Sequence, residues 1–203
     1  MVVLNKMLRK ILSLVSNYNF IGIFDNALTK EECHILINQF EKSPSYDGGI
    51  FYGGQFIVDH SVKKCKQLDD PFFNDKSIIS NIVYTRLDLC ISKYKKKYPT
   101  LGYMAPYEVT DTYSFQKYED ESDGYKSWHQ EHGPGETSSR AFAWMFYLND
   151  AKSGTEFMHF SNVHAKMGRC VIWPASWPYI HRGIVPNKGL KYIVTGWLNF
   201  HEE

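Results

Sequence analysis

The sequence predicts an α+β fold in which N-terminal helices support a jelly roll, also called a double-stranded β-helix. Two helical patterns come first, and about seven short β-rich segments follow from residue 112 onward. Helices followed by a run of strands is the order expected of such a fold. A length of 203 residues and a hydrophobic content of 43% suffice for one core, so we expect a single domain.

Within this domain, we expect residues 1–110 to provide helical support and a substrate lid, and residues 111–203 to form the jelly-roll core. The first 17 residues place Leu4, Leu8 and Ile11 at helical spacing, with lysine and arginine on the other face. This amphipathic helix is expected to pack on the domain; a membrane-surface role and a dimer contact remain open. It lacks the roughly 20 apolar residues of a spanning segment, so we expect no stable membrane insertion.

The next segments alternate between regular structure and loops. Residues 19–28 read as a short strand, and Thr29 and Glu32 have capping-box spacing at the start of a helix over 29–41. Residues 44–75 carry four glycines among aromatic residues and are the predicted lid; its lysines 63, 64 and 66 are expected to be solvated. A second helix is expected over 77–97, where Pro99 ends it.

From residue 112 the pattern changes to short runs that are rich in β-branched and aromatic residues. They predict strands at 112–118, 126–131, 140–149, 155–160, 169–175, 179–185 and 190–200.

Charge and cysteine content limit the possible partners and location. The net charge is +1 and the pI is near 7.7, so no global field favours nucleic acid or an anionic membrane. The cysteines at 33, 65, 90 and 170 form no CxxC pair. We therefore expect reduced thiols and a cytoplasmic location; the oligomeric state stays open.

Three side chains form a candidate metal site. His129 and Glu131 are two apart in a predicted strand, so both side chains would leave one face. His181 falls in a later strand that could cross the same layer. Two histidines and one carboxylate leave coordination positions open, as in non-haem Fe(II) oxygenases.

Lys191 adds a second requirement, because it lies ten positions after His181 on the next predicted strand and would face the interior. A buried cation beside a metal needs an anionic partner. The C5 carboxylate of 2-oxoglutarate would be that partner, while the keto acid end chelates the iron. A cupin-like enzyme that uses another metal without oxoglutarate does not account for this lysine.

The region from Tyr118 to Phe200 resembles the prolyl 4-hydroxylase-like branch of the 2-oxoglutarate/Fe(II) dioxygenases. The matching stretches are YEDESDGYKSWHQE, RAFAWMFYLNDAKSGTEF and HRGIVPNKGLKYIVTGW. Two positions differ from the family pattern: Glu131 stands where Asp is commoner, and Ser153-Gly154 stands where the family has two glycines. The resemblance implies oxoglutarate-pocket roles for Tyr118, Tyr147, Thr155 and Trp197, and a position near the substrate mouth for Arg140.

The resemblance also implies the activity: a dioxygenase that uses Fe(II), 2-oxoglutarate and O2 to hydroxylate an aliphatic C–H, releasing succinate and CO2. The favoured substrate is a peptidyl prolyl residue. Two alternatives remain. The enzyme could act on a free amino acid or another small molecule, or the chain could be a jelly-roll binding module without turnover.

Overall fold

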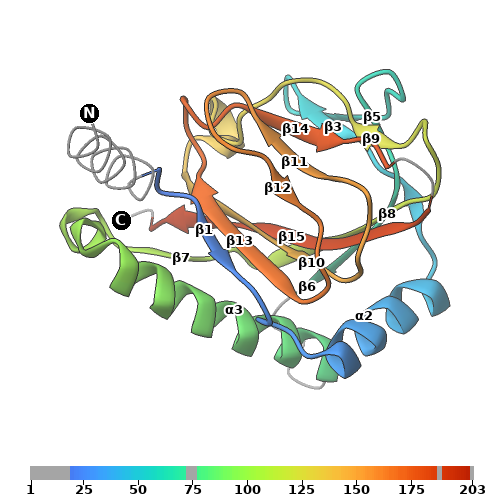
Figure 1. Cartoon of the computed structure of the whole chain (residues 1–203). Helices are drawn as coiled ribbons and strands as arrows, with labels where there is room; N and C mark the ends of the chain where they lie inside the picture. The colour runs from blue at the N-terminus through green and yellow to red at the C-terminus, as the bar shows by residue number, and fades with distance from the viewer. Residues whose placement is uncertain (1–18, 72–76, 187–188, 202–203) are drawn as a thin grey trace, which may run out of the picture.

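The structure is a computed structural model that describes residues 19–71, 77–186 and 189–201. Two helices lie along one side of a large antiparallel sheet, and a smaller sheet covers its other side (Figure 1). The predicted fold class is thereby confirmed. The predicted N-terminal helix lies outside the described residues. No described helix has the length and apolar content needed to cross a membrane.

The helices are α2 (Lys30–Lys42) and α3 (Ile78–Lys97), with short 3-10 turns η1 (Pro99–Tyr103) and η2 (Gly135–Thr137). The strands before residue 110 are β1 (Gly22–Phe24), β2 (Tyr46–Asp47), β3 (Ile50–Tyr52), β4 (Gln55–Ile57), β5 (Lys63–Lys64), β6 (Lys66–Pro71) and β7 (Tyr107–Val109). The later strands are β8 (Thr112–Tyr118), β9 (Gly124–Tyr125), β10 (Arg140–Tyr147), β11 (Gly154–Phe157), β12 (Val163–His164), β13 (Arg169–Pro174), β14 (His181–Ile184) and β15 (Lys191–Phe200).

Both helices begin where the sequence predicts. Thr29 caps α2 through a complete capping box: its hydroxyl accepts from the Glu32 amide at 3.2 Å, and its own amide donates to the Glu32 carboxylate at 2.8 Å. Ser77 caps α3 by accepting from the Ser80 amide. Arg86 of α3 binds the same Glu32 carboxylate at 2.8 Å, which joins the two helices.

The buried face of α3 is narrower than its apolar pattern suggests. Ile79, Val83 and Leu87 face the large sheet, whereas Ile78 is 68% exposed and Leu89 is 47% exposed. Helix α3 contacts the sheet along the stripe of buried residues, and Ile78 and Leu89 lie outside that stripe.

The large sheet has the strand order β1-β13-β10-β15-β8-β6-β2, with β7 beside β15. On its inner strand β10, side chains alternate between two cores. Trp144 and Phe146 belong to the core under the helices, while Ala143 and Tyr147 belong to the core between the sheets. The smaller sheet, β12-β11-β14, closes this second core. The candidate site lies in that inner layer.

The predicted lid, residues 44–75, consists of short strands as far as it is described. Strand β6 joins the large sheet, β5 pairs with β9, and β3 and β4 form a hairpin. Gly53 and Gly54 turn this hairpin at positive φ, 61° and 76°, which glycine adopts without strain. Phe51 and Phe56 stand on it with much of their surface exposed. Figure 1 shows β3, β5 and β9 near β14, on the side away from the helices.

Candidate metal centre

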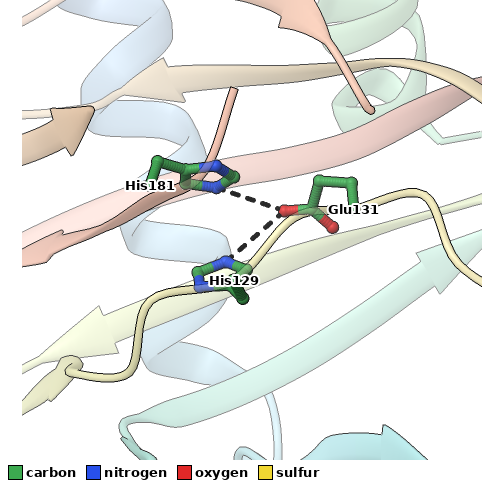
Figure 2. Close-up of side chains that lie close together, drawn as sticks. All are labelled: His129, Glu131 and His181. Carbon is green, nitrogen blue, oxygen red and sulfur yellow. Dashed lines mark ion pairs between the residues drawn. The ribbon is translucent and has the colours of Figure 1, made fainter. Parts of the chain in front are cut away.

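Two side chains of one loop, His129 and Glu131, and one at the start of strand β14, His181, converge on one point (Figure 2). Glu131 Oε1 lies 3.6 Å from His129 Nε2 and 3.4 Å from His181 Nε2. The ligand atoms of the three all lie within 4.8 Å of one another. His181 is 4% exposed, and the other two are half-buried. This geometry can hold a metal ion.

The local structure of the His129–Glu131 pair differs from the prediction. Residues 126–131 form a loop, not a strand. Backbone bonds fix the loop at two places: His129 exchanges hydrogen bonds with His181, and the Glu131 amide donates to the Ala175 carbonyl at 3.0 Å. Ladder pairing over one residue is too short for a strand, but it suffices to bring both histidines together.

The histidine rings present their lone pairs to the site. Nδ1 of His129 lies 3.0 Å from the Ser127 carbonyl, and Nδ1 of His181 lies 2.9 Å from the Tyr179 carbonyl. A carbonyl oxygen only accepts, so both Nδ1 atoms carry the proton and each Nε2 is unprotonated in a neutral ring. Burial, followed by the neighbouring His181, also lowers the pKa of His129, which favours the neutral form.

Glu131 supplies the negative charge. Burial alone would raise the pKa of its carboxyl, but the proximity of the two histidines holds it well below the usual range, so Glu131 is a carboxylate. Two lone pairs and an anionic oxygen that face one point repel each other unless a cation lies between them. The donor set of two imidazoles and a carboxylate therefore fits a divalent transition metal.

The second oxygen of Glu131 is held from outside the site. Trp197 Nε1 donates to Oε2 at 2.8 Å, and Arg140 Nη1 donates to the same oxygen at 3.3 Å. Arg140 also stacks on the Trp197 ring, 3.7 Å from its centroid. Trp197 and Arg140 therefore contact the carboxylate of the metal group.

Aromatic rings enclose both histidines. The Tyr125 ring stacks on His129, with centroids 3.5 Å apart and an interplanar angle of 9°. Trp173 meets His181 edge-on at 5.1 Å, and Phe157 lies 5.5 Å away from the same ring. These contacts restrict the rotation of both imidazoles and limit the access of water.

Lys191 is buried without an anionic partner among the described residues. It is 3% exposed, and its ammonium lies 4.1 Å from the ring centroid of Tyr118, its neighbour across the β8–β15 ladder. Burial lowers the pKa of Lys191 to about 8. The Tyr118 hydroxyl donates to Gln116 Oε1 at 2.6 Å. Tyr118 and Lys191 thus lie together, and their roles in binding oxoglutarate stay predictions.

Tyr147 and Thr155 form a second buried pair, with 2.6 Å between their hydroxyl oxygens. Thr155 lies opposite Gly183 in the β11–β14 ladder. A Cβ on Gly183 would come 3.8 Å from Lys191 Nζ, so this glycine links the hydroxyl pair to the ammonium. The structure therefore brings Tyr147 and Thr155 toward Lys191; their binding roles stay predictions.

Two residues beside the site escaped the sequence analysis. Tyr125 gave no signal, because nothing in its position indicates that its ring would lie on His129. Lys63 was expected to be solvated, and that prediction is wrong: it is 5% exposed, while Lys64 and Lys66 lie nearer the surface. The strand alternation turns residues 63, 65 and 67 inward, which a lysine-rich sequence conceals.

Comparison with known proteins finds a family similar to the part of the chain that carries this site. The model of the 2OG-Fe(II) oxygenase superfamily matches residues 113–199, which include all nine predicted site residues. No curated protein sequence matches the chain.

Solved structures share the fold at low sequence identity. A viral collagen prolyl hydroxylase from Paramecium bursaria Chlorella virus-1, solved with 2OG, has a TM-score of 0.67 and 15% identity over 92% of this chain and 99% of its own. A Trichoplax adhaerens prolyl hydroxylase, solved with a peptide fragment of hypoxia inducible factor, has a TM-score of 0.66 and 14% identity. The match covers 98% of this chain and 91% of the other. A non-haem α-ketoglutarate-dependent epimerase from nogalamycin biosynthesis has a TM-score of 0.60 and 11% identity. The match covers 95% of this chain and 84% of the other.

The family match and these structures confirm the resemblance that residues 118–200 indicate. They also account for the donor set around Glu131. Residues 113–199, somewhat less than half of the chain, match the 2OG-Fe(II) oxygenase superfamily, and the donor set fits a dioxygenase that uses Fe(II), 2-oxoglutarate and O2.

Proposed function

We propose that His129, Glu131 and His181 bind the Fe(II) and that the enzyme hydroxylates a prolyl residue of a peptide. The observation that carries this proposal is the convergence of two imidazole lone pairs and one carboxylate oxygen within 4.8 Å. The overall reaction converts the substrate C–H, 2-oxoglutarate and O2 into the hydroxylated product, succinate and CO2. When bound, the iron supplies the activation of O2 that side chains cannot provide.

Lys191 is proposed to bind the C5 carboxylate of 2-oxoglutarate. The support is physical: a buried ammonium that lacks an ionic partner is costly, and a ligand carboxylate would remove that cost. Tyr118 lies against the ammonium, and Thr155, whose hydroxyl pairs with that of Tyr147, lies opposite Gly183 in the β11–β14 ladder. These three residues are proposed to complete the oxoglutarate pocket with hydrogen bonds.

Trp197 and Arg140 are proposed to orient the metal-binding carboxylate. Both donate to Glu131 Oε2, which leaves Oε1 as the oxygen nearest to the two histidines. A glutamate has one more rotatable bond than an aspartate, so an outer hold on its carboxylate keeps the inner oxygen in place. Trp197 can still border the oxoglutarate pocket, and Arg140 can still face the substrate mouth.

The chain's aromatic residues are proposed to keep water from the reacting centre. Tyr125 covers one face of His129, while Trp173 and Phe157 pack around His181. Exclusion of water protects an oxidant from side reactions. Residues 1–110 and 111–203 would then divide the work: the first part supplies support and the lid, and the second carries the chemistry.

A peptide substrate is supported by two features. A structural neighbour was solved with a bound peptide fragment, and three neighbours carry prolyl hydroxylase names. The described part of the lid presents Phe51 and Phe56, and Trp128 stands half-exposed next to His129. Exposed aromatic groups beside a site are typical of surfaces that bind peptides or apolar ligands.

A small-molecule substrate is the second candidate. The neighbour from nogalamycin biosynthesis has the same fold and is named an epimerase, so this fold also serves chemistry other than prolyl hydroxylation. Both candidates require turnover of oxoglutarate.

The test is a succinate assay with mass spectrometry of the substrate. Purified Fe(II)-loaded protein is incubated with 2-oxoglutarate, air and a panel of proline-containing peptides, with a matched panel of free amino acids. We expect succinate together with a mass gain of one oxygen on a peptide proline, and neither product in His129→Ala. Oxidation confined to the free amino acids would favour the small-molecule candidate. Absence of succinate in every arm would contradict turnover and favour a binding module.

A further inference from the structure

Lys63 is a second buried lysine near the metal group. It is 5% exposed, and its ammonium donates to the Gly49 carbonyl at 3.1 Å and to Gln67 Oε1 at 2.8 Å. Both acceptors are neutral, and no carboxylate of the described residues forms an ion pair with it. Burial lowers the pKa of Lys63, which shows that its environment opposes the charge. Lysine is rarely buried unless it is paired, so a buried ammonium at position 63 indicates a structural role and not a solvated surface charge.

The two acceptors of Lys63 belong to different parts of the fold. Gly49 lies in the outer part of the lid between β2 and β3, and Gln67 lies on β6, the part of the lid that joins the large sheet. The Gln67 side chain also bonds to Ser114 and Asp69, so it is fixed to neighbouring positions of that sheet. Lys63 therefore connects the segment around Gly49 to strand β6.

The lid fits closely over this link. A Cβ on Gly48 would lie 2.4 Å from Cys65 Sγ and 3.0 Å from Gln67 Oε1. A Cβ on Gly49 would lie 2.5 Å from the Ile57 carbonyl oxygen. Only glycine allows the backbone to come so near, so residues 48–49 rest directly on the inner side chains of β5 and β6.

Lys63 also borders the metal group through Tyr125. The two residues are paired in the β5–β9 ladder, and the Lys63 ammonium lies 5.8 Å from the centroid of the Tyr125 ring. Tyr125 in turn stacks on His129, so it contacts both Lys63 and a residue of the metal group. The Lys126 amide donates to the Val62 carbonyl at 2.8 Å, which ties the loop of residues 126–131, here called the metal loop, to the residue just before β5.

We propose that Lys63 is a positioning residue that holds residues 48–57 of the lid against the metal loop and keeps Tyr125 stacked on His129. The Lys63 ammonium binds one acceptor at Gly49 and one at Gln67 of the large sheet, and Lys63 is paired with Tyr125 in the β5–β9 ladder. A shorter or uncharged side chain cannot do this. The inference rests on the proposed function only where it concerns the binding of iron.

The experiment is hydrogen–deuterium exchange on the full chain without metal. In Lys63→Met, two hydrogen bonds from a charged donor are lost, so amides in 48–57 and 124–131 should exchange on the order of tenfold faster. Strands β10 and β13 should exchange as in the wild type. Lys63→Arg keeps the charge and the donors, and should restore most of the protection.

Lys66→Met is the matched control, because Lys66 lies on the same stretch and pairs with Asp47 of the lid, but at the surface. An exposed pair contributes little, so exchange should stay at the wild-type rate. Unchanged exchange of 48–57 in Lys63→Met would overturn the proposal, as would an equal increase in β10 and β13. If Lys63→Met does not fold, Lys63→Gln carries the same test with a shorter neutral donor.

A second readout addresses the metal loop. Anaerobic titration with Fe(II) alone should show affinity several-fold weaker in Lys63→Met than in the wild type, with recovery in Lys63→Arg. Equal affinity in Lys63→Met would refute the link through Tyr125. If the wild type itself binds no Fe(II), the proposed function fails, while the exchange experiment still decides the role of Lys63 in the lid.

Discussion

Oxoglutarate affinity should depend on pH through Lys191. Burial lowers the pKa of this lysine from 10.5 to about 8. Each pKa unit corresponds to about 1.4 kcal/mol, so burial disfavours the ammonium by about 3 kcal/mol. Only the ammonium attracts a carboxylate. Affinity should therefore be full below pH 8 and should fall as the pH rises through that value.

The magnitude follows from the fraction of protonated lysine. With a pKa of about 8, this fraction falls about tenfold between pH 7 and pH 9, and the dissociation constant should rise by about the same factor. The assay is isothermal titration calorimetry of Mn(II)-loaded protein with 2-oxoglutarate at pH 7, 8 and 9. Tyr147 and Cys65 do not titrate in this range, because burial raises their pKa values to about 12 and about 11.

Variants at position 191 distinguish the pH dependence caused by Lys191 from that caused by other titrating groups. Lys191→Ala should lower affinity on the order of a hundredfold and remove the pH dependence. Lys191→Arg should bind better than the alanine variant and show no pH dependence, since arginine stays protonated. Lys152→Ala removes an exposed lysine and should match the wild type. A pH dependence that persists in Lys191→Arg would refute the reasoning.

Three further changes test other parts of the structure. Trp197→Phe removes the N–H donor to Glu131 Oε2, so Fe(II) affinity by anaerobic titration should fall about tenfold; unchanged affinity would show that the bond does not orient the carboxylate. Thr155→Val removes the hydroxyl that pairs with Tyr147 and should raise the KM for oxoglutarate in the succinate assay while Fe(II) affinity stays constant; an equal loss of both would indicate a general disruption. Thr29→Ala removes the capping box of α2 and should cost about 1 kcal/mol, seen as a Tm lower by about 2–4 °C in a thermal melt, and a Tm equal to the wild type would contradict the cap's contribution.

Much of the fold could be predicted because local signals agree with the tertiary structure. The capping box at Thr29 marks the start of α2, and Ser77 marks the start of α3. Alternating apolar runs predict β8, β10, β13 and β15, because these strands pack between two cores. The exposure of Ile78 and Leu89 could not be predicted, since it depends on which stripe of α3 meets the sheet.

The metal group could be predicted because residue types and spacing carry its chemistry, although the strand assigned to His129 and Glu131 is a loop. Their proximity to His181 depends on backbone bonds to His181 and Ala175, which are distant in sequence. The contacts of Lys63 and Tyr125 escaped prediction for the same reason. Neither residue type signals burial, and only the β5–β9 pairing brings them beside His129.

The measurement that tests the central claim most directly is an anaerobic titration of the Fe(II)-loaded protein with 2-oxoglutarate, followed by visible absorption. Chelation of the iron by the keto acid should produce a weak charge-transfer band that saturates with oxoglutarate. We expect the band in the wild type and its loss in His129→Ala. Binding of iron without a band, or a band that persists in His129→Ala, would contradict the assignment of this site.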